Sequence, residues 1–86
     1  LNNLKVAKIN LDKIQMFIDN KKLNLNDTIN IEVLKKLKII NKNSKKLKIL
    51  GNGEIKQKIN IQADLISKSA VEKLNKIGGS VQINKK

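Results

Sequence analysis

The sequence predicts a small mixed α/β domain with the element order β-α-α-β-β-α-β. Three observations carry this prediction. Hydrophobic residues recur at helical spacing in several segments, aliphatic and polar residues alternate with a period of two in others, and Gly51-Asn52-Gly53 separates two of the alternating segments. Since 86 residues suffice for one domain with a modest core, we expect residues 1–86 to form a single domain.

The first third of the chain predicts a strand, a helix and a long connection. A short strand over residues 6–9 leads into Asn10, a residue type common at helix N-caps. A helix over residues 11–19 follows, because its hydrophobic residues mark one buried face, and Asn20 offers a stop. The polar, asparagine-rich stretch 21–30 is typical of a connection.

A second, shorter helix is predicted to begin at the cap residue Asn30. Val33, Leu34 and Leu37 recur at the spacing that turns them toward a core. The asparagine- and serine-containing segment 41–44 then indicates a turn.

Strict alternation marks the segments on both sides of the glycine loop. Lysines alternate with leucine and isoleucine before the loop, and residues 55–63 alternate in the same way after it, so each strand has a polar and an aliphatic face. If the two strands form a hairpin across the three-residue loop, Lys48 lies opposite Lys56 and Lys46 lies opposite Lys58.

The last helix is predicted over residues 67–77. Ser69 and Glu72 have the spacing of a capping box, and Gly78-Gly79 ends the helix. A closing strand is expected over residues 80–84.

Charge is concentrated in the middle of the chain. The formal net charge is +12, and residues 35–58 hold nine lysines and one acid, Glu54, so this stretch alone carries +8. A folded domain tolerates such self-repulsion when an external polyanion offsets it, and nucleic acid is the commonest polyanion in a cell. Because Phe17 is the sole aromatic residue and is needed for the core, we expect contacts to backbone and shape rather than stacked bases.

Two clusters are the candidate contact sites from residue pattern alone. The lysines on the polar face of the two central strands form the first, although lysines also serve simply to solubilise a sheet face. Lys68, flanked by Ser67 at the start of the last helix, forms the second, because amides, hydroxyls and an ammonium converge where the helix dipole favours an anion. Ordinary helix capping explains this second pattern equally well.

Catalysis finds no support in the sequence. The chain has no histidine and no cysteine, and its seven acids are scattered, so we expect no enzyme, no metal site and no cofactor. No apolar run approaches the roughly 20 residues of a membrane span, and the start shows neither a secretory core nor an arginine-rich leader. We therefore expect no membrane partner and no small-molecule substrate.

Several ordered segments carry a family resemblance that covers nearly the whole chain. They are the residues Leu47-Lys48-Ile49-Leu50-Gly51-Asn52-Gly53-Glu54-Ile55, Ser67-Lys68-Ser69-Ala70, Gly78-Gly79-Ser80-Val81, Ile9-Asn10-Leu11-Asp12-Lys13-Ile14 and Glu32-Val33-Leu34. Together they resemble the C-terminal domain of the large-subunit ribosomal protein L-fifteen family in its bacterial or organellar form.

The resemblance implies a structural ribosomal protein that binds and stabilises large-subunit ribosomal RNA, with neighbouring ribosomal proteins as further partners. It also implies an irregular superhelical α/β core, in which the two central strands need not form a hairpin. Carried over from the family, the positions Lys46, Lys48, Asn52 and Lys68 are the expected RNA contacts. Together with the residue pattern, the expected RNA-binding residues are Lys42, Lys45, Lys46, Lys48, Asn52, Lys56, Lys58, Ser67 and Lys68.

The sequence departs from the family at its start. The family normally begins with a long glycine- and basic-rich arm, and nothing here matches it. The arm lies outside this sequence, is encoded as a separate piece, or has been lost.

Two alternatives stay open at this stage. A basic protein-interaction module that docks on an acidic partner is the first, and membrane-surface binding is a weaker one, because the helices lack large aromatic anchors. Lysine, asparagine and isoleucine have A/T-rich codons, so a mitochondrial genome, with the protein in the mitochondrial matrix, is attractive, while an A/T-rich bacterium and its cytoplasm fit equally well.

Overall fold

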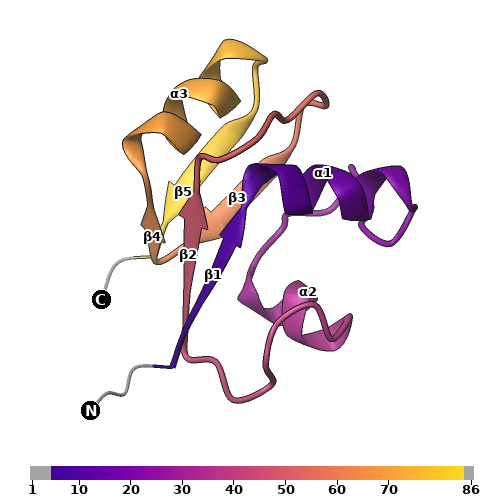
Figure 1. Ribbon diagram of the computed structural model, residues 1–86, viewed down its shortest axis with the longest axis vertical. Helices are drawn as coiled ribbons and strands as arrows, with labels where there is room; N and C mark the ends of the chain where they lie inside the picture. Colours follow the sequence, from indigo (N-terminus) through magenta and orange to yellow (C-terminus); the bar gives the residue numbers. More distant parts are fainter. Residues whose placement is uncertain (1–4, 85–86) are drawn as a thin grey trace.

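The computed structural model describes residues 5–84, which form three helices and five strands in the order β-α-α-β-β-β-α-β (Figure 1). The elements are β1 (Val6–Asn10), α1 (Leu11–Asp19), α2 (Ile31–Lys36), β2 (Lys46–Leu50), β3 (Asn60–Ala63), β4 (Leu65–Ile66), α3 (Lys68–Lys76) and β5 (Ser80–Ile83). The predicted mixed α/β class is confirmed, and the two-residue strand β4 joins the expected order. The alternating residues 55–59, in contrast, lie outside any strand.

Two parallel sheets form the centre of the molecule. One sheet has the order β1-β2-β4, and the other pairs β3 with β5. Helices α1 and α2 lie beside β1, and α3 lies on the other side of β2 (Figure 1). Parallel strands need crossover connections. The connection from β1 to β2 contains α1 and α2, that from β3 to β5 contains α3, and that from β2 to β4 contains β3 and no helix.

The hairpin expected across the glycine loop is wrong. Strand β2 uses both of its edges for parallel neighbours, with Lys48 opposite Lys8 on β1 and opposite Leu65 on β4. The chain after the loop passes into the second sheet, so neither Lys56 nor Lys58 lies opposite a lysine of β2.

The glycine loop fails to reverse the chain because its backbone is fixed against two helices. The Lys73 ammonium of α3 donates to the carbonyl oxygens of Gly51 at 2.8 Å and Gly53 at 2.6 Å. The backbone amide of Asp12, in the first turn of α1, donates to the Asn52 carbonyl oxygen at 3.1 Å. The loop therefore joins the end of β2 to α1 and α3 rather than to a neighbouring antiparallel strand.

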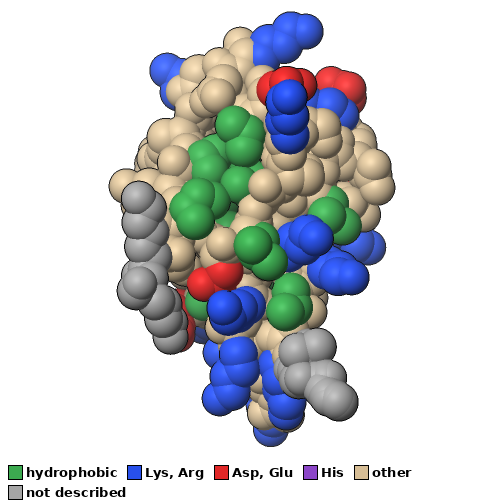
Figure 2. Space-filling model, turned by 90° about the vertical axis from the view of Figure 1, so that its left-hand side faces the viewer, with side chains coloured by type: hydrophobic (Ala, Val, Ile, Leu, Met, Phe, Trp, Pro, Cys, Tyr) green, Lys and Arg blue, Asp and Glu red, His purple; other side chains and the backbone are tan. Residues whose placement is uncertain are grey.

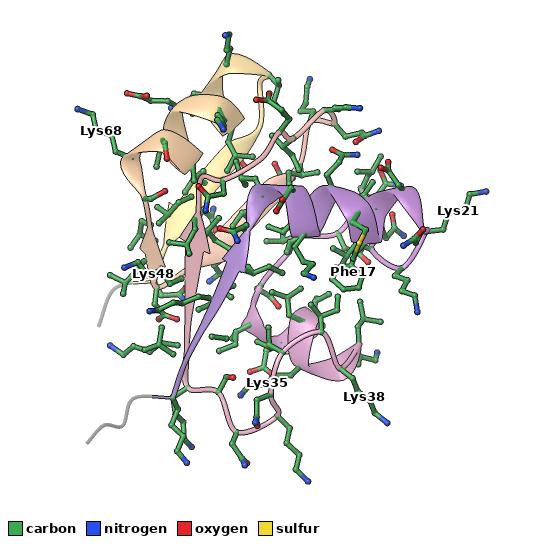
Figure 3. The ribbon with its side chains drawn as sticks, in the orientation of Figure 1. Phe17, Lys21, Lys35, Lys38, Lys48 and Lys68 are labelled. Atoms are coloured by element: carbon green, nitrogen blue, oxygen red, sulfur yellow. The ribbon has the colours of Figure 1, made fainter. Side chains whose placement is uncertain are left out.

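The division of β2 into two faces is confirmed. Leu47 and Ile49 are fully buried, Lys46 is exposed and Lys48 is half-buried. The core consists of aliphatic residues from both sheets and all three helices, and these are Ile9, Leu11, Ile14, Ile18, Leu23, Ile29, Leu34, Leu47, Ile49, Ile55, Ile59, Ile61, Ala63, Ala70 and Leu74. Phe17 lies on the side of α1 that faces α2 and packs partly buried against this core (Figure 3), as expected.

The helix N-termini differ in part from the predicted caps. Asn30 caps α2 by accepting from the Val33 amide at 2.9 Å, as predicted. Asn10 occupies the N-cap position of α1, but its side chain makes no capping hydrogen bond. For α3 the capping box at Ser69 is wrong, because the cap is Ser67, whose hydroxyl accepts from the Ala70 amide at 3.3 Å.

All three helices end in the same motif, in which the residue after the C-cap adopts a left-handed conformation. Gly78 does so after α3 with φ of 81°, but Lys21 and Lys38 do so after α1 and α2 with φ of 61° and 63°. After α1, the Lys21 amide donates to the Ile18 carbonyl oxygen and the Lys22 amide donates to that of Phe17. This pair of hydrogen bonds defines a Schellman motif, a position where glycine is usual.

Glycine at position 21 is therefore expected to stabilise the protein relative to alanine. The variants Lys21→Gly and Lys21→Ala remove the same charge, but only glycine relieves the left-handed conformation, so Lys21→Gly should be about 1 kcal/mol more stable in urea unfolding. Equal stability of the two variants would show that the backbone conformation costs nothing at this position.

Candidate nucleic-acid interface

Lysines from two distant parts of the sequence meet where β1 and β2 begin. The backbone amides of Lys45 and Lys46 both donate to the carbonyl oxygen of Lys5, at 2.6 and 3.1 Å. Lys42 lies in the turn that precedes them, at the lower end of the molecule in Figure 1. The space-filling view shows lysines gathered at this same end (Figure 2).

The cluster continues along the outer face of the three-stranded sheet. In the parallel register Lys8 of β1 lies directly opposite Lys48 of β2, and Val6 lies opposite Lys46. The side chains of Ile9 and Ile49, one residue further along each strand, point into the core. We call this group the basic strip, and it consists of Lys5, Lys8, Lys42, Lys45, Lys46 and Lys48.

The basic strip has no carboxylate partner within ion-pair distance. Within residues 5–84, the one ion pair within 4 Å joins Lys73 to Glu54, which are outside the strip. The Asp64 carboxylate lies against β2, where it accepts from the Leu47 amide at 2.9 Å. Like charges opposed across strands cost up to about 1 kcal/mol per pair, so an external anion would relieve this arrangement.

The structure separates other predicted contact residues from the strip. Lys56 and Lys58 lie in the loop between β2 and β3, at the opposite end of the 36 Å long axis from the turn 41–44 (Figure 1). The Lys56 amide donates to the Gln15 side-chain oxygen at 2.7 Å, which fixes this loop on α1. Asn52 is exposed near the start of the same loop. These three residues form a second group and share no face with Lys46.

Ser67 and Lys68 lie at the start of α3. The Ser67 hydroxyl is used as the helix cap, which agrees with the simpler of the two interpretations of this motif. Lys68 is exposed and points away from the molecule beside α3 (Figure 3). The Lys68 ammonium is therefore exposed to solvent, whereas the Ser67 hydroxyl is taken up by the helix cap.

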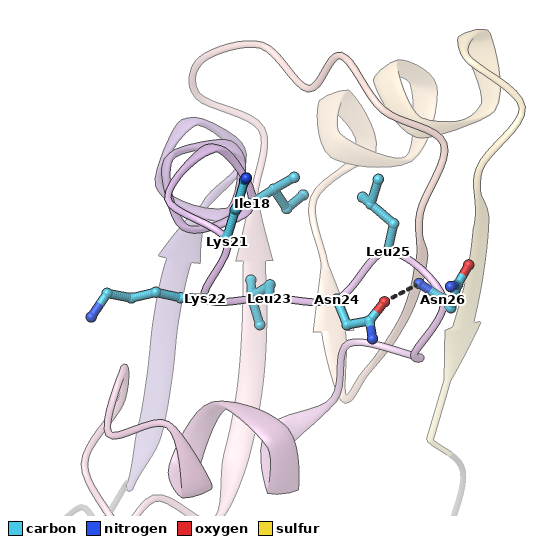
Figure 4. Close-up of a pocket in the computed structure, with 7 residues that line it drawn as sticks. All are labelled: Ile18, Lys21, Lys22, Leu23, Asn24, Leu25 and Asn26. Atoms are coloured by element: carbon cyan, nitrogen blue, oxygen red, sulfur yellow. Dashed lines mark hydrogen bonds between the residues drawn. The ribbon is translucent and has the colours of Figure 1, made fainter.

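A surface hollow lies at the end of α1, apart from the basic strip. It has a volume of about 500 Å³ and is formed by the end of α1 and the connection that follows, from Ile18 and residues 21–26 (Figure 4). The Asn24 side chain accepts from the Asn26 amide at 2.9 Å, so part of its polar lining is already satisfied. A ligand pocket normally encloses most of its ligand, and an open hollow lined by one segment does not.

Two further kinds of site are absent from residues 5–84. No group of three or more acidic, histidine or cysteine side chains is placed to hold a metal ion. Within the same residues, every helix is too short or too polar to cross a membrane.

Sequence reasoning missed three lysines that matter to this arrangement. Lys8 carried a detectable signal, because it alternates with Ala7 and Ile9 in the same way as the lysines of β2. Lys5 carried no such signal in the sequence, because only the pairing of β1 with β2 brings it next to Lys45. Lys73 was not singled out in the sequence, and its ammonium donates to the carbonyl oxygens of Gly51 and Gly53.

Comparison with known proteins gives consistent results. The family of ribosomal proteins that includes 50S-L15 and 50S-L18e matches residues 8–82. The chain is 66% identical over 80 residues to the "Large ribosomal subunit protein uL15" of Pelagibacter ubique, which covers 93% of this chain and 52% of that protein. The proteins of the same name from Afipia carboxidovorans and Prochlorococcus marinus are 40% and 39% identical, over 93% and 96% of this chain and 49% and 51% of their own lengths. The chain thus spans about half the length of the curated relatives it matches.

Proposed function

The chain belongs to the ribosomal protein family of 50S-L15 and 50S-L18e, and from this premise we propose that it is a structural constituent of the large ribosomal subunit. In this role it binds and stabilises large-subunit ribosomal RNA and catalyses no reaction. The names of its relatives support the subunit, and the chemistry of the surface supports the RNA contact.

The observation that carries the RNA contact is the basic strip. Six lysines from two separate segments are held together by the pairing of β1 with β2, and none has a carboxylate within 4 Å among the described residues. Lysine ammonium groups bind phosphate oxygens as flexible point charges, which suits recognition of a folded RNA backbone rather than of base edges. Phosphates beside the strip would offset the repulsion between Lys8 and Lys48.

A second contact region is proposed at the other end of the molecule. Asn52, Lys56 and Lys58 are exposed there, and Lys68 is exposed at the start of α3. An RNA that contacts both regions would have to follow the long axis of the domain, so the two regions are tested separately.

A bacterial ribosome is the proposed location. The relatives named above come from bacteria, and the identity to one of them reaches 66%. The bacterial alternative therefore has this support, and the mitochondrial matrix stays a prediction from composition alone.

The test compares two variants that remove the same charge. The strip variant replaces Lys5, Lys8, Lys46 and Lys48 by glutamine, and the matched control replaces Lys13, Lys22, Lys36 and Lys76, so both lower the net charge from +12 to +8. Binding to deproteinised large-subunit rRNA is measured across a salt series. We expect the strip variant to bind at least about 10-fold more weakly, with its salt slope reduced by about one for each phosphate that it no longer neutralises.

The control variant decides between a defined surface and diffuse attraction. It should lose much less affinity than the strip variant. Equal losses of rRNA affinity in both variants would mean that binding depends on the number of lysines and not on the basic strip. An unchanged affinity of the strip variant for rRNA, together with weaker binding to an acidic protein, would instead favour the protein-interaction alternative.

A further inference from the structure

The strand β5 has one free edge. It pairs with β3 alone among the described strands, and the amides of Ser80 and Asn84 donate to the carbonyl oxygens of Ile59 and Ala63 at 3.0 and 2.8 Å. Backbone groups of successive strand residues point in opposite directions within the sheet. The amides and carbonyls of Val81 and Ile83 therefore point away from β3.

This edge lacks the features that keep edge strands from pairing. Natural edge strands are commonly blocked by a charged side chain, a proline or a bulge. The β5 sequence Ser80-Val81-Gln82-Ile83 has none of these, although 30% of the chain is charged. The edge strand β1 of the other sheet carries Lys8, and the outer edge of β3 is used by Ile29.

One exposed hydrophobic side chain accompanies the free edge. Ile83 on β5 is 43% exposed. The face of the molecule that carries α3 and β4 shows hydrophobic side chains in its middle, with lysines beside the lower ones and at its lower end (Figure 2). A surface with open backbone groups and an exposed aliphatic side chain matches the requirements for added-strand binding.

RNA and a second copy of this chain both fit this edge poorly. The strand offers neither a cation for phosphates nor an aromatic ring for bases. A second copy would bring another +12 of charge to the same place. An extended segment of a different protein can satisfy the backbone groups, and acidic residues in it would complement Lys58, which lies beside Gly78 just before β5.

We propose that the free edge of β5 binds an extended, acidic segment of a neighbouring protein, which adds a strand to the sheet of β3 and β5. The free edge of β5 contains none of the basic-strip lysines, so the proposal does not depend on RNA binding by the strip, and Lys58 beside it belongs to the second proposed contact region. The proposal depends on the proposed place of the chain in the large subunit only through the particle used in the test.

Amide hydrogen exchange tests the pairing residue by residue. In the free protein, the amides of Val81 and Ile83 should exchange fast, while those of Ser80 and Asn84 are protected. In purified large subunits, we expect Val81 and Ile83 to become protected by about 10-fold or more. Fast exchange of both amides within the subunit would overturn the proposal.

Two reference samples separate the possible occupants. Protection of Val81 and Ile83 by deproteinised rRNA alone, or in the concentrated free protein, would also overturn the proposal, because the occupant would then be RNA or a second copy.

A variant pair gives an independent measurement. Ile83→Pro removes an amide that the fold does not use, and Ile83→Val keeps it.

Both variants compete with the natural protein during reconstitution of large subunits. We expect Ile83→Pro to be incorporated several-fold less than Ile83→Val, provided that thermal unfolding confirms that both are folded. If Ile83→Pro fails to fold, Ile83→Lys replaces it, because a charge at the edge opposes pairing. Equal incorporation of the folded variants would contradict the proposal.

Discussion

Replacing Gly53 by alanine is expected to destabilise the protein by about 2–4 kcal/mol. Gly53 adopts φ of 85°, which costs an alanine about 1 kcal/mol. A Cβ atom there would also lie 2.9 Å from the Asp12 Cα and 2.7 Å from its Cγ, and relieving such overlap typically costs a further 1–3 kcal/mol. For a small domain this is a large share of a total of about 5–15 kcal/mol.

Two other glycines separate the conformational from the steric cost. Gly78 has φ of 81° but open surroundings, with Lys58 Cε at 3.4 Å as its nearest contact. Gly51 has no positive φ, but a Cβ would lie 2.7 Å from the Ala70 amide nitrogen. In urea unfolding we expect Gly53→Ala to be the most destabilising of the three. If Gly53→Ala costs no more than Gly78→Ala, the close packing of the loop on Asp12 is refuted.

Replacing Ile49 by alanine should have an effect of similar or larger size. Ile49 is fully buried in the central strand, opposite Ile9 on β1 and Ile66 on β4. Truncation of such a residue removes buried surface and leaves a cavity, which costs about 2–5 kcal/mol. Since the core is made of aliphatic residues from both sheets, this change should lower the urea midpoint steeply without changing the slope of the transition.

Leu65 is the matched control for Ile49. It lies on the neighbouring strand of the same sheet but is 48% exposed. Its replacement by alanine should cost less than about 1 kcal/mol, because little buried surface is removed. Comparable costs at Leu65 and Ile49 would mean that the outer face of the sheet is covered in solution.

These two effects bear on the proposed interface because Ile49 and Gly53 hold β2 in place. The strand positions Lys46 and Lys48 next to Lys5 and Lys8, and the loop fixes its far end. A destabilised variant would therefore bind RNA less well because less of it is folded, and not because it lacks a contact with RNA. The strip variant is informative only if its unfolding midpoint stays close to that of the matched control.

The period-two pattern of β2 could be read from the sequence, because it depends only on neighbours along the chain. Leu47 and Ile49 face the core, as their alternation with lysine predicts. The helices over 11–19 and 68–76 were predictable for the same reason, as was the cap at Asn30. Lys46 and Lys48 could accordingly be named as residues of a polar strand face before any partner strand was known.

The strands that pair with β2 could not be predicted from the sequence. A glycine loop between two alternating segments is typical of a hairpin, and the pattern is the same whether or not the chain reverses. Two sets of contacts decide that the chain does not reverse at the glycine loop. One is the pair of hydrogen bonds from Lys73 to the loop carbonyls, and the other is the parallel pairing of β2 with β1 and β4. Each joins residues far apart in sequence.

The sequence alone thus determined the two faces of β2, where most elements lie and that the surface is strongly basic, since these follow from local periodicity and composition. It did not determine burial everywhere, because Leu37 was expected to face the core and is 42% exposed. Only the tertiary structure decided which lysines share a surface. It brought Lys5 and Lys8 to Lys46 and Lys48, and it placed Lys56 and Lys58 at the other end of the molecule. The physical reason is that the choice of partner strand is fixed by hydrogen bonds between residues far apart in sequence, and this choice leaves no periodic trace in the chain.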